Sequence, residues 1–503
     1  PAWAGAAAQT ANSQTAVPAQ AAPAVSSQSQ ASYDLTFPAA KGVKESLSLD
    51  NRQVTYYAYR DLVYVAHPKN SDYEKMNIFI PAAYLEGKSV NGYTAQTAPI
   101  FLPNQVGGYM PGKAGDPKDT HVMGGGSTST LLQALDRGYV VASPAIRGRS
   151  TTDANGTYVG KAPALIVDYK ATVRYLRHNR KQLPAGDTEK IISNGTSAGG
   201  AMSSLLGSTG DHPDYEPYLK ELGAAEESDA IYAASCYCPI TNLDHADMAY
   251  EWEFCGLNDY SKKIEIPPQE GETDATFIVD EGTMTEAQQK MAEELKSLFP
   301  AYVNGLGLKD TEGNALELDA NGDGSFKEYV LSYVKKCVQK EYEKGTDLSG
   351  LDWMTIEKGT VTKVDFDKYI RFRTRMKATP AFDNVSMGTP ENELFGTPDT
   401  KYRHFTAFSK EHSAVNGELA DGQQIKMMNP MNYIADDKAV KAEHFRIRHG
   451  AVDRDTSLAI SAMLTASLEN HGVDVELQYP WGMPHAGDYD LEELFAWIDK
   501  ICG

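Results

Sequence analysis

The stretch Lys190-Ile-Ile-Ser-Asn-Gly195-Thr-Ser197-Ala-Gly199-Gly200-Ala201 decides the fold of this chain. Its first half is a short apolar run that predicts a buried strand, and Ala198–Leu206 predicts a helix of small residues. A G-x-S-x-G sequence between a strand and a helix holds its serine on a sharp, strained turn, where flanking glycines avoid clashes. We interpret Ser197 as a nucleophile and the N–H of Ala198 as a donor to a developing oxyanion. The alternative is a glycine-rich packing turn.

Two loops further along the chain contain the partners that a serine nucleophile needs. A serine hydroxyl is activated by a base that is oriented by an acid, and here both should follow it in the order acid, histidine. Asp453 ends the sequence His449-Gly-x-x-Asp after a predicted strand, and His485 lies between the next strand and the last helix. We therefore predict a triad of Ser197, His485 and Asp453. Asp455 is a rival for the acid, and His449 is interpreted as structural.

A glycine pair after an earlier strand is the candidate for the second oxyanion donor. The apolar run Pro99–Val106 predicts a strand, and Gly107-Gly108-Tyr109 follows it. Two glycines let the backbone approach a substrate and present an N–H. We expect Gly107 or Gly108 to donate this N–H, and the alternative is a plain turn.

Strands and helices alternate around these motifs, which predicts an α/β fold with a mostly parallel sheet flanked by helices. The alternation stops near Thr241 and resumes near Glu443. We predict a catalytic domain of residues 33–240 and 431–503, interrupted by an inserted domain of residues 241–430. Residues 1–32, which are rich in Ala, Gln, Ser and Pro, predict a disordered leader or linker. Its Ala-rich part resembles a secretory cleavage region, so we expect a secreted or cell-surface protein.

Composition excludes several classes of protein. The 503 residues include 47 Lys and Arg against 68 Asp and Glu, and a net charge of −21 argues against a nucleic-acid binder. No stretch approaches the roughly 18 apolar residues that a membrane span needs. Five cysteines are too few and too irregularly spaced for a disulfide framework. A content of 41% hydrophobic residues is enough for a large core.

A possible cation loop lies in the inserted domain. Asp319, Asn321 and Asp323 occupy positions one, three and five of an EF-hand-like sequence, and glycine follows at position six. Position twelve is Val330, where a bidentate glutamate is expected. We therefore consider two readings, a structural calcium site and a surface turn.

Six stretches together resemble the bacterial tannases, or tannin acyl hydrolases, which have the α/β-hydrolase fold. The resemblance covers the chain from about Tyr33 to its end. The serine motif alone is generic, but the set is specific; it consists of Pro103-Asn-Gln-Val-Gly-Gly-Tyr-Met-Pro-Gly112, Gly195-Thr-Ser-Ala-Gly-Gly200, Ala378-Thr-Pro-Ala-Phe-Asp383, Gly388-Thr-Pro-Glu391-Asn392, Asp453-Arg-Asp455 and Pro484-His485.

This resemblance implies a serine esterase that hydrolyses galloyl esters without a cofactor and has its insertion as a lid. It places the triad on Ser197, Asp453 and His485, in agreement with their positions in the chain. It also implies that Lys377, Glu391 and Asp455 bind the three phenolic hydroxyls of the galloyl group. Phenolic O–H groups donate to carboxylates, and an ammonium favours a phenolate-like oxygen.

Two other functions remain open at this point. A feruloyl or other aromatic-acid esterase would share the fold and the triad. A non-catalytic polyphenol-binding protein would share only the fold. Removal of one phenolic hydroxyl from the substrate should cripple a tannase and leave a feruloyl esterase active.

Overall fold

The core of the molecule is a mixed sheet of nine strands, seen in a computed structural model that describes residues 32–120, 129–266, 273–274 and 276–503. The order across the sheet is β1 (Val43–Leu49), β2 (Arg52–Val63), β3 (Lys75–Pro81), β5 (Val140–Pro144), β4 (Pro99–Pro103), β6 (Asp187–Thr196), β7 (Ala233–Tyr237), β12 (His444–Arg448) and β13 (Asp474–Gln478). Neighbours from β5 to β13 are parallel, whereas β1, β2 and β3 join antiparallel. The predicted mostly parallel sheet is confirmed.

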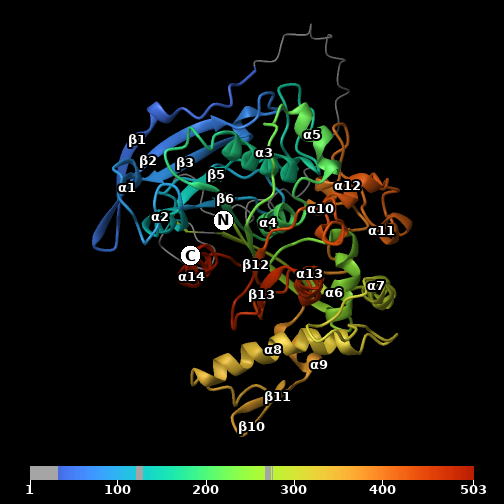
Figure 1. The fold of residues 1–503 in the computed structure, drawn as a ribbon. Helices are drawn as coiled ribbons and strands as arrows, with labels where there is room; N and C mark the ends of the chain where they lie inside the picture. The colour runs from blue at the N-terminus through green and yellow to red at the C-terminus, as the bar shows by residue number, and fades with distance from the viewer. Residues whose placement is uncertain (1–31, 121–128, 267–272, 275) are drawn as a thin grey trace.

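Helices cover both faces of this sheet, as Figure 1 shows. On one face α2 (Thr130–Asp136) packs against α14 (Leu491–Cys502), and on the other α3 (Ala164–His178) packs against α4 (Ala198–Ser208). Every residue of β4, β5 and β7 is buried. Strands buried on both faces are continuous apolar runs, which is why these segments could be predicted from the sequence.

The first strands of the sheet depart from the expected pattern. We expected one strand over Met76–Leu85, but β3 ends at Pro81 and Ala82–Leu85 forms the short helix α1. Strand β1 was not expected, because its residues Val43–Leu49 are largely exposed and contain Lys and Glu. Charged, half-exposed strands are typical of a sheet edge and carry a weak strand pattern.

The chain between β7 and β12 forms further elements outside the main sheet. Helices α8 and α9 and the hairpin β10–β11 lie together at one end of the molecule (Figure 1). The capping box expected at Thr285 is present at the start of α7. Buried aromatic rings of Trp252, Phe299, Phe326 and Phe366 pack together and give this part its own apolar core. The elements are α6 (Ala246–Phe254), β8 (Asp259–Ile266), β9 (Thr276–Thr283), α7 (Glu286–Gly305), α8 (Ser325–Glu343), β10 (Met354–Glu357), β11 (Thr360–Val364), α9 (Phe366–Arg373), α10 (Pro390–Leu394), α11 (Ala407–Glu411) and α12 (Gly422–Lys426).

Two further helices complete the catalytic part of the fold. Helix α5 (Glu216–Glu221) follows α4, and α13 (Leu458–Asn470) packs on β13 and contacts α6 and α8. All five cysteines are free thiols, as the sequence indicated. None of the described helices is both long enough and apolar enough to cross a membrane. Residues 1–31, nearly all of the expected leader, lie outside the described residues.

Candidate active site

Ser197 lies on a strained turn between β6 and α4. Its backbone φ is 64°, a left-handed conformation that non-glycine residues rarely adopt. The turn is fixed by neighbouring strands, because the Ser197 N–H donates to the carbonyl of Tyr237 at 2.9 Å. A Cβ on Gly195 would lie 2.1 Å from the carbonyl oxygen of Gly199, so this tight packing requires glycine. Strain of this kind persists where the surrounding structure enforces it, as at nucleophile turns.

The three residues of the expected triad lie in hydrogen-bond contact. His485 Nε2 is 2.7 Å from Ser197 Oγ, and His485 Nδ1 is 2.8 Å from Asp453 Oδ2. The ionised Asp453 accepts the Nδ1 proton, which leaves Nε2 free to accept a proton from the serine. The other oxygen of Asp453 accepts the N–H of Asp455 at 2.9 Å. Asp453, not Asp455, therefore orients the histidine.

Charges around this pair favour its ionised form. Burial alone would raise the pKa of Asp453, but the neighbouring His485 holds it below the ordinary value. Burial alone would lower the pKa of His485, but the carboxylates of Asp453 and Asp455 raise it well above the ordinary value. His449 is different, because burial lowers its pKa to about 4 and its Nδ1 lies 2.7 Å from Ser461 Oγ. His449 is thus a neutral residue behind Asp453.

Ala198 and Gly108 line the same cavity as Ser197, whereas Gly107 does not. The Gly108 N–H donates to no other residue in the described part of the chain. Asn104 ties the two segments together, because its Nδ2 donates to the Gly199 carbonyl at 3.0 Å and its Oδ1 accepts the Val106 N–H at 3.1 Å. Asn104 was quoted among the motifs, but its role in positioning was missed.

Lys377, Glu391 and Asp455 line this cavity of about 220 Å³ together with Ser197. Lys377 Nζ is 2.8 Å from Asp455 Oδ1. Burial alone would lower the pKa of Lys377, but Asp455 and Glu391 raise it. Burial would raise the pKa of Asp455, but Lys377 and His485 hold it well below its ordinary value, whereas burial does raise the pKa of Glu391. The cavity therefore holds a fixed ammonium between two carboxyl groups.

Helix α6 positions both the triad and these charged groups through buried ion pairs that the sequence did not reveal. Glu253 bonds to Arg373 at 2.9 Å, and Arg373 in turn donates to the Asp453 carbonyl. Glu251 bonds to Arg375 at 2.8 Å, and Arg375 donates to the Lys377 carbonyl at 2.6 Å. All four side chains are fully buried. Loss of one partner would leave an uncompensated buried charge, which typically costs about 3–5 kcal/mol.

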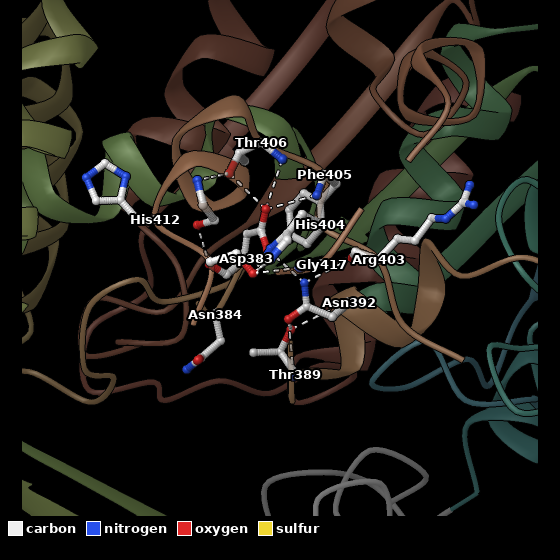
Figure 2. Close-up of polar contacts among 12 residues, drawn as sticks. Asp383, Asn384, Thr389, Asn392, Arg403, His404, Phe405, Thr406, His412 and Gly417 are labelled. Atoms are coloured by element: carbon white, nitrogen blue, oxygen red, sulfur yellow. Dashed lines mark hydrogen bonds and ion pairs between the residues drawn. The ribbon is translucent and has the colours of Figure 1, made fainter. Parts of the chain in front are cut away.

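Asp383 holds the segment that carries Glu391 (Figure 2). Its Oδ1 accepts the side-chain amide of Asn392 at 2.8 Å and lies 2.7 Å from His404 Nδ1. Its Oδ2 accepts the N–H groups of Phe405 and Thr406, both at 2.9 Å. Asn392 follows Glu391 directly at the start of α10. Asp383 belongs to one of the quoted motifs, which was its only signal in the sequence.

The candidate cation loop is occupied by contacts within the protein. Asp319 Oδ1 accepts the N–H groups of Asn321 at 2.8 Å and of Asp323 at 3.0 Å. Asp323 Oδ1 accepts from Lys327 Nζ at 2.8 Å. These contacts fit the surface turn, and a calcium ion at Asp319, Asn321 and Asp323 would have to displace them. Calcium binding here stays a prediction.

The chain is similar to solved structures over almost its whole length. A tannase from Lactobacillus plantarum is 45% identical, with a TM-score of 0.89, over 93% of this chain and 100% of that one. A Fusobacterium nucleatum tannase is 44% identical, with a TM-score of 0.87, over 94% of this chain and 100% of that one. A tannin acyl hydrolase in complex with ethyl gallate is also 44% identical, with a TM-score of 0.87, over 93% and 99%.

A protein-family model described as BD-FAE matches residues 107–260, which contain the serine turn and the Gly107-Gly108 loop. No curated protein matches the chain. The identity to solved tannases and the coverage of both chains agree with the resemblance of the motifs. The chain therefore belongs to the bacterial tannase, or tannin acyl hydrolase, family of carboxylic ester hydrolases.

Proposed function

We propose that this protein hydrolyses the galloyl ester bonds of hydrolysable tannins and of simple gallate esters, and releases gallic acid. The observation that carries this proposal is one cavity that joins Ser197 to Lys377, Glu391 and Asp455. A related tannin acyl hydrolase is described in complex with ethyl gallate. A nucleophile at one part of a small cavity and hydroxyl-binding charges at another fit a small ester of a polyphenolic acid.

Acylation begins with proton transfer from Ser197 Oγ to His485 Nε2 as the oxygen attacks the galloyl carbonyl. Asp453 stabilises the imidazolium that forms. The N–H groups of Ala198 and Gly108 donate to the developing oxyanion, which is the usual largest source of stabilisation in acyl transfer. The C–O bond to the alcohol then breaks, and the alcohol leaves with the proton from His485.

Deacylation repeats these steps with water as the nucleophile. His485 accepts a proton from water, the hydroxide oxygen attacks the galloyl ester of Ser197, and the serine leaves with that proton. Gallic acid is released and the free enzyme is restored. The side chains and water supply every atom and proton in this reaction, so we propose no cofactor.

Lys377, Glu391 and Asp455 would select the acyl group by its hydroxyls. The carboxyl groups accept phenolic O–H donors, and the Lys377 ammonium donates to a phenolic oxygen. An ester without these hydroxyls leaves the charges of the cavity unpaired, and such sites reject analogues strongly. With a net charge of −21, the chain needs a local positive group of this kind for an electron-rich ring. We also propose that the protein is exported.

Hydrolysis of methyl gallate and of methyl ferulate by the same preparation tests this function. We expect release of gallic acid from methyl gallate and much slower release of ferulic acid, because ferulate carries one free phenolic hydroxyl. Faster hydrolysis of methyl ferulate would favour the aromatic-acid esterase. Binding of methyl gallate without hydrolysis of either ester would favour the polyphenol-binding protein.

The pH dependence of the reaction should report His485. Because only the neutral imidazole accepts the serine proton, kcat/KM for methyl gallate should fall about tenfold per pH unit below the pKa of His485. That pKa is raised by Asp453 and Asp455, so the midpoint should lie above the ordinary histidine value of about 6.5. A kcat/KM that stays constant between about pH 5 and pH 8 would contradict the role of His485 as the base.

A further inference from the structure

The hairpin β8–β9 is attached to the segment that carries Lys377. At its root, the Ser261 N–H donates to the Arg375 carbonyl at 3.0 Å, two residues before Lys377. The other strand is closed by the Met284 N–H, which donates to the Asn258 carbonyl at 2.8 Å. Arg375 is itself held by Glu251 of α6. The start of the hairpin therefore has a fixed position beside the charged part of the cavity.

Lys262 and Asp280 are cross-strand partners in this hairpin, so their side chains share one face of it. Both residues line the cavity that contains Ser197. Lys263 lies on the opposite face, where it is exposed and its Nζ is 4.0 Å from the centre of the Phe277 ring. Two adjacent lysines thus have different surroundings, one in the cavity and one on the outer surface.

The Lys262 ammonium makes no hydrogen bond or ion pair with any other residue that the structure describes. Burial and the neighbouring Lys377 ammonium lower its pKa, while Asp455 and Glu391 act in the opposite direction. A partly buried cation without an acceptor is unfavourable unless a ligand supplies one. The acceptor must be an oxygen that reaches the space between Lys262, Lys377 and the two carboxyl groups.

We propose that Lys262 is a further specificity-determining residue, which donates a hydrogen bond to a phenolic oxygen of the bound acyl ring. This inference rests on the proposed galloyl esterase function, because the phenolic rim of the acyl group is what reaches this end of the cavity. Two ammonium groups and two carboxyl groups would then face the hydroxyls together. An acyl ring without phenolic oxygens gains nothing from Lys262.

Lys262→Met and Lys263→Met form a matched pair that tests this proposal. Each variant removes one ammonium from the same hairpin, so both change the net charge equally. The measurement is kcat/KM for methyl gallate and for methyl benzoate, whose ring carries no hydroxyl. We expect Lys262→Met to raise KM for methyl gallate about 10-fold to 100-fold and to lower the preference for methyl gallate to the same extent. Lys263→Met should keep the wild-type preference, and Lys262→Arg should recover part of it.

Each result has a distinct meaning. If the wild type does not hydrolyse methyl gallate, the proposed function fails and this inference fails with it. If the wild type is active and Lys262→Met keeps its preference, only the role of Lys262 is wrong. An equal loss in Lys262→Met and Lys263→Met would show an effect of net charge, and would also overturn the proposed contact. A loss of kcat on both esters without a change of preference would assign Lys262 a structural role instead.

Discussion

Ser197→Ala is expected to reduce kcat for methyl gallate by about 10⁶-fold, as loss of the nucleophile does in other serine hydrolases. The substitution removes the Oγ that lies 2.7 Å from His485 Nε2, and no acyl-enzyme can form without it. Loss of one small hydroxyl leaves the cavity and its charges intact. Binding of gallate, measured by calorimetry, should therefore remain close to that of the wild type.

Ser208→Ala is a suitable control for this variant. Ser208 lies at the other end of α4, where its buried hydroxyl donates to the Ser204 carbonyl at 2.6 Å. This control also removes a buried serine hydroxyl from the helix, but it does not touch the cavity. Gallate release by Ser197→Ala within about tenfold of the wild-type rate would exclude Ser197 as the nucleophile.

Asp453→Asn should lower kcat by about 10⁴-fold, because an amide in place of the carboxylate favours the wrong tautomer of His485. The Asn side chain would present an N–H₂ group to Nδ1, so the imidazole proton would move to Nε2 and block proton transfer from Ser197. The loop should keep its shape, since Arg373 holds the backbone carbonyl of this residue. Thermal unfolding close to that of the wild type would confirm this.

Asp455→Asn provides the contrast for that prediction. Asp455 bonds to Lys377 and lines the cavity, so its substitution should act mainly on KM for methyl gallate. Asp453→Asn should act mainly on kcat. The opposite division of effects between the two variants would exchange the roles of these neighbouring carboxylates.

Chemistry that depends on local sequence could be predicted from the chain alone. The turn around Ser197 needs glycines at fixed positions, and the strand before it and the helix after it have clear patterns. The spacing could not choose between Asp453 and Asp455, because both follow the end of the same strand. Only the hydrogen bond from His485 to Asp453 separates them.

The residues that position the site could not be predicted, because their partners are far away in sequence. Glu251 and Glu253 resemble solvated charges on a helix, yet both are buried and bond to arginines more than a hundred residues away. Burial of such charges depends on tertiary pairing, which no periodic pattern records. Asp383 and Lys262 share this property, since nothing near them in sequence marks them as parts of a site.

Three expectations stay predictions. Export rests on residues 1–32, almost all of which lie outside the described part of the chain. The boundaries of the inserted domain at residues 241–430, and its role as a lid, rest on the alternation of elements and on the family resemblance. A calcium ion at Asp319, Asn321 and Asp323 rests on spacing that the contacts of the turn also explain.

The most direct test of selection by hydroxyl-binding charges is the ratio of kcat/KM for methyl gallate to kcat/KM for methyl benzoate in the wild-type protein. The two esters share the scissile bond and differ only in the three hydroxyls that Lys377, Glu391 and Asp455 are proposed to bind. A ratio above about 10³ is predicted, because an ester without hydroxyls leaves buried charges unpaired. A ratio near one would contradict the proposal that this cavity recognises the galloyl group.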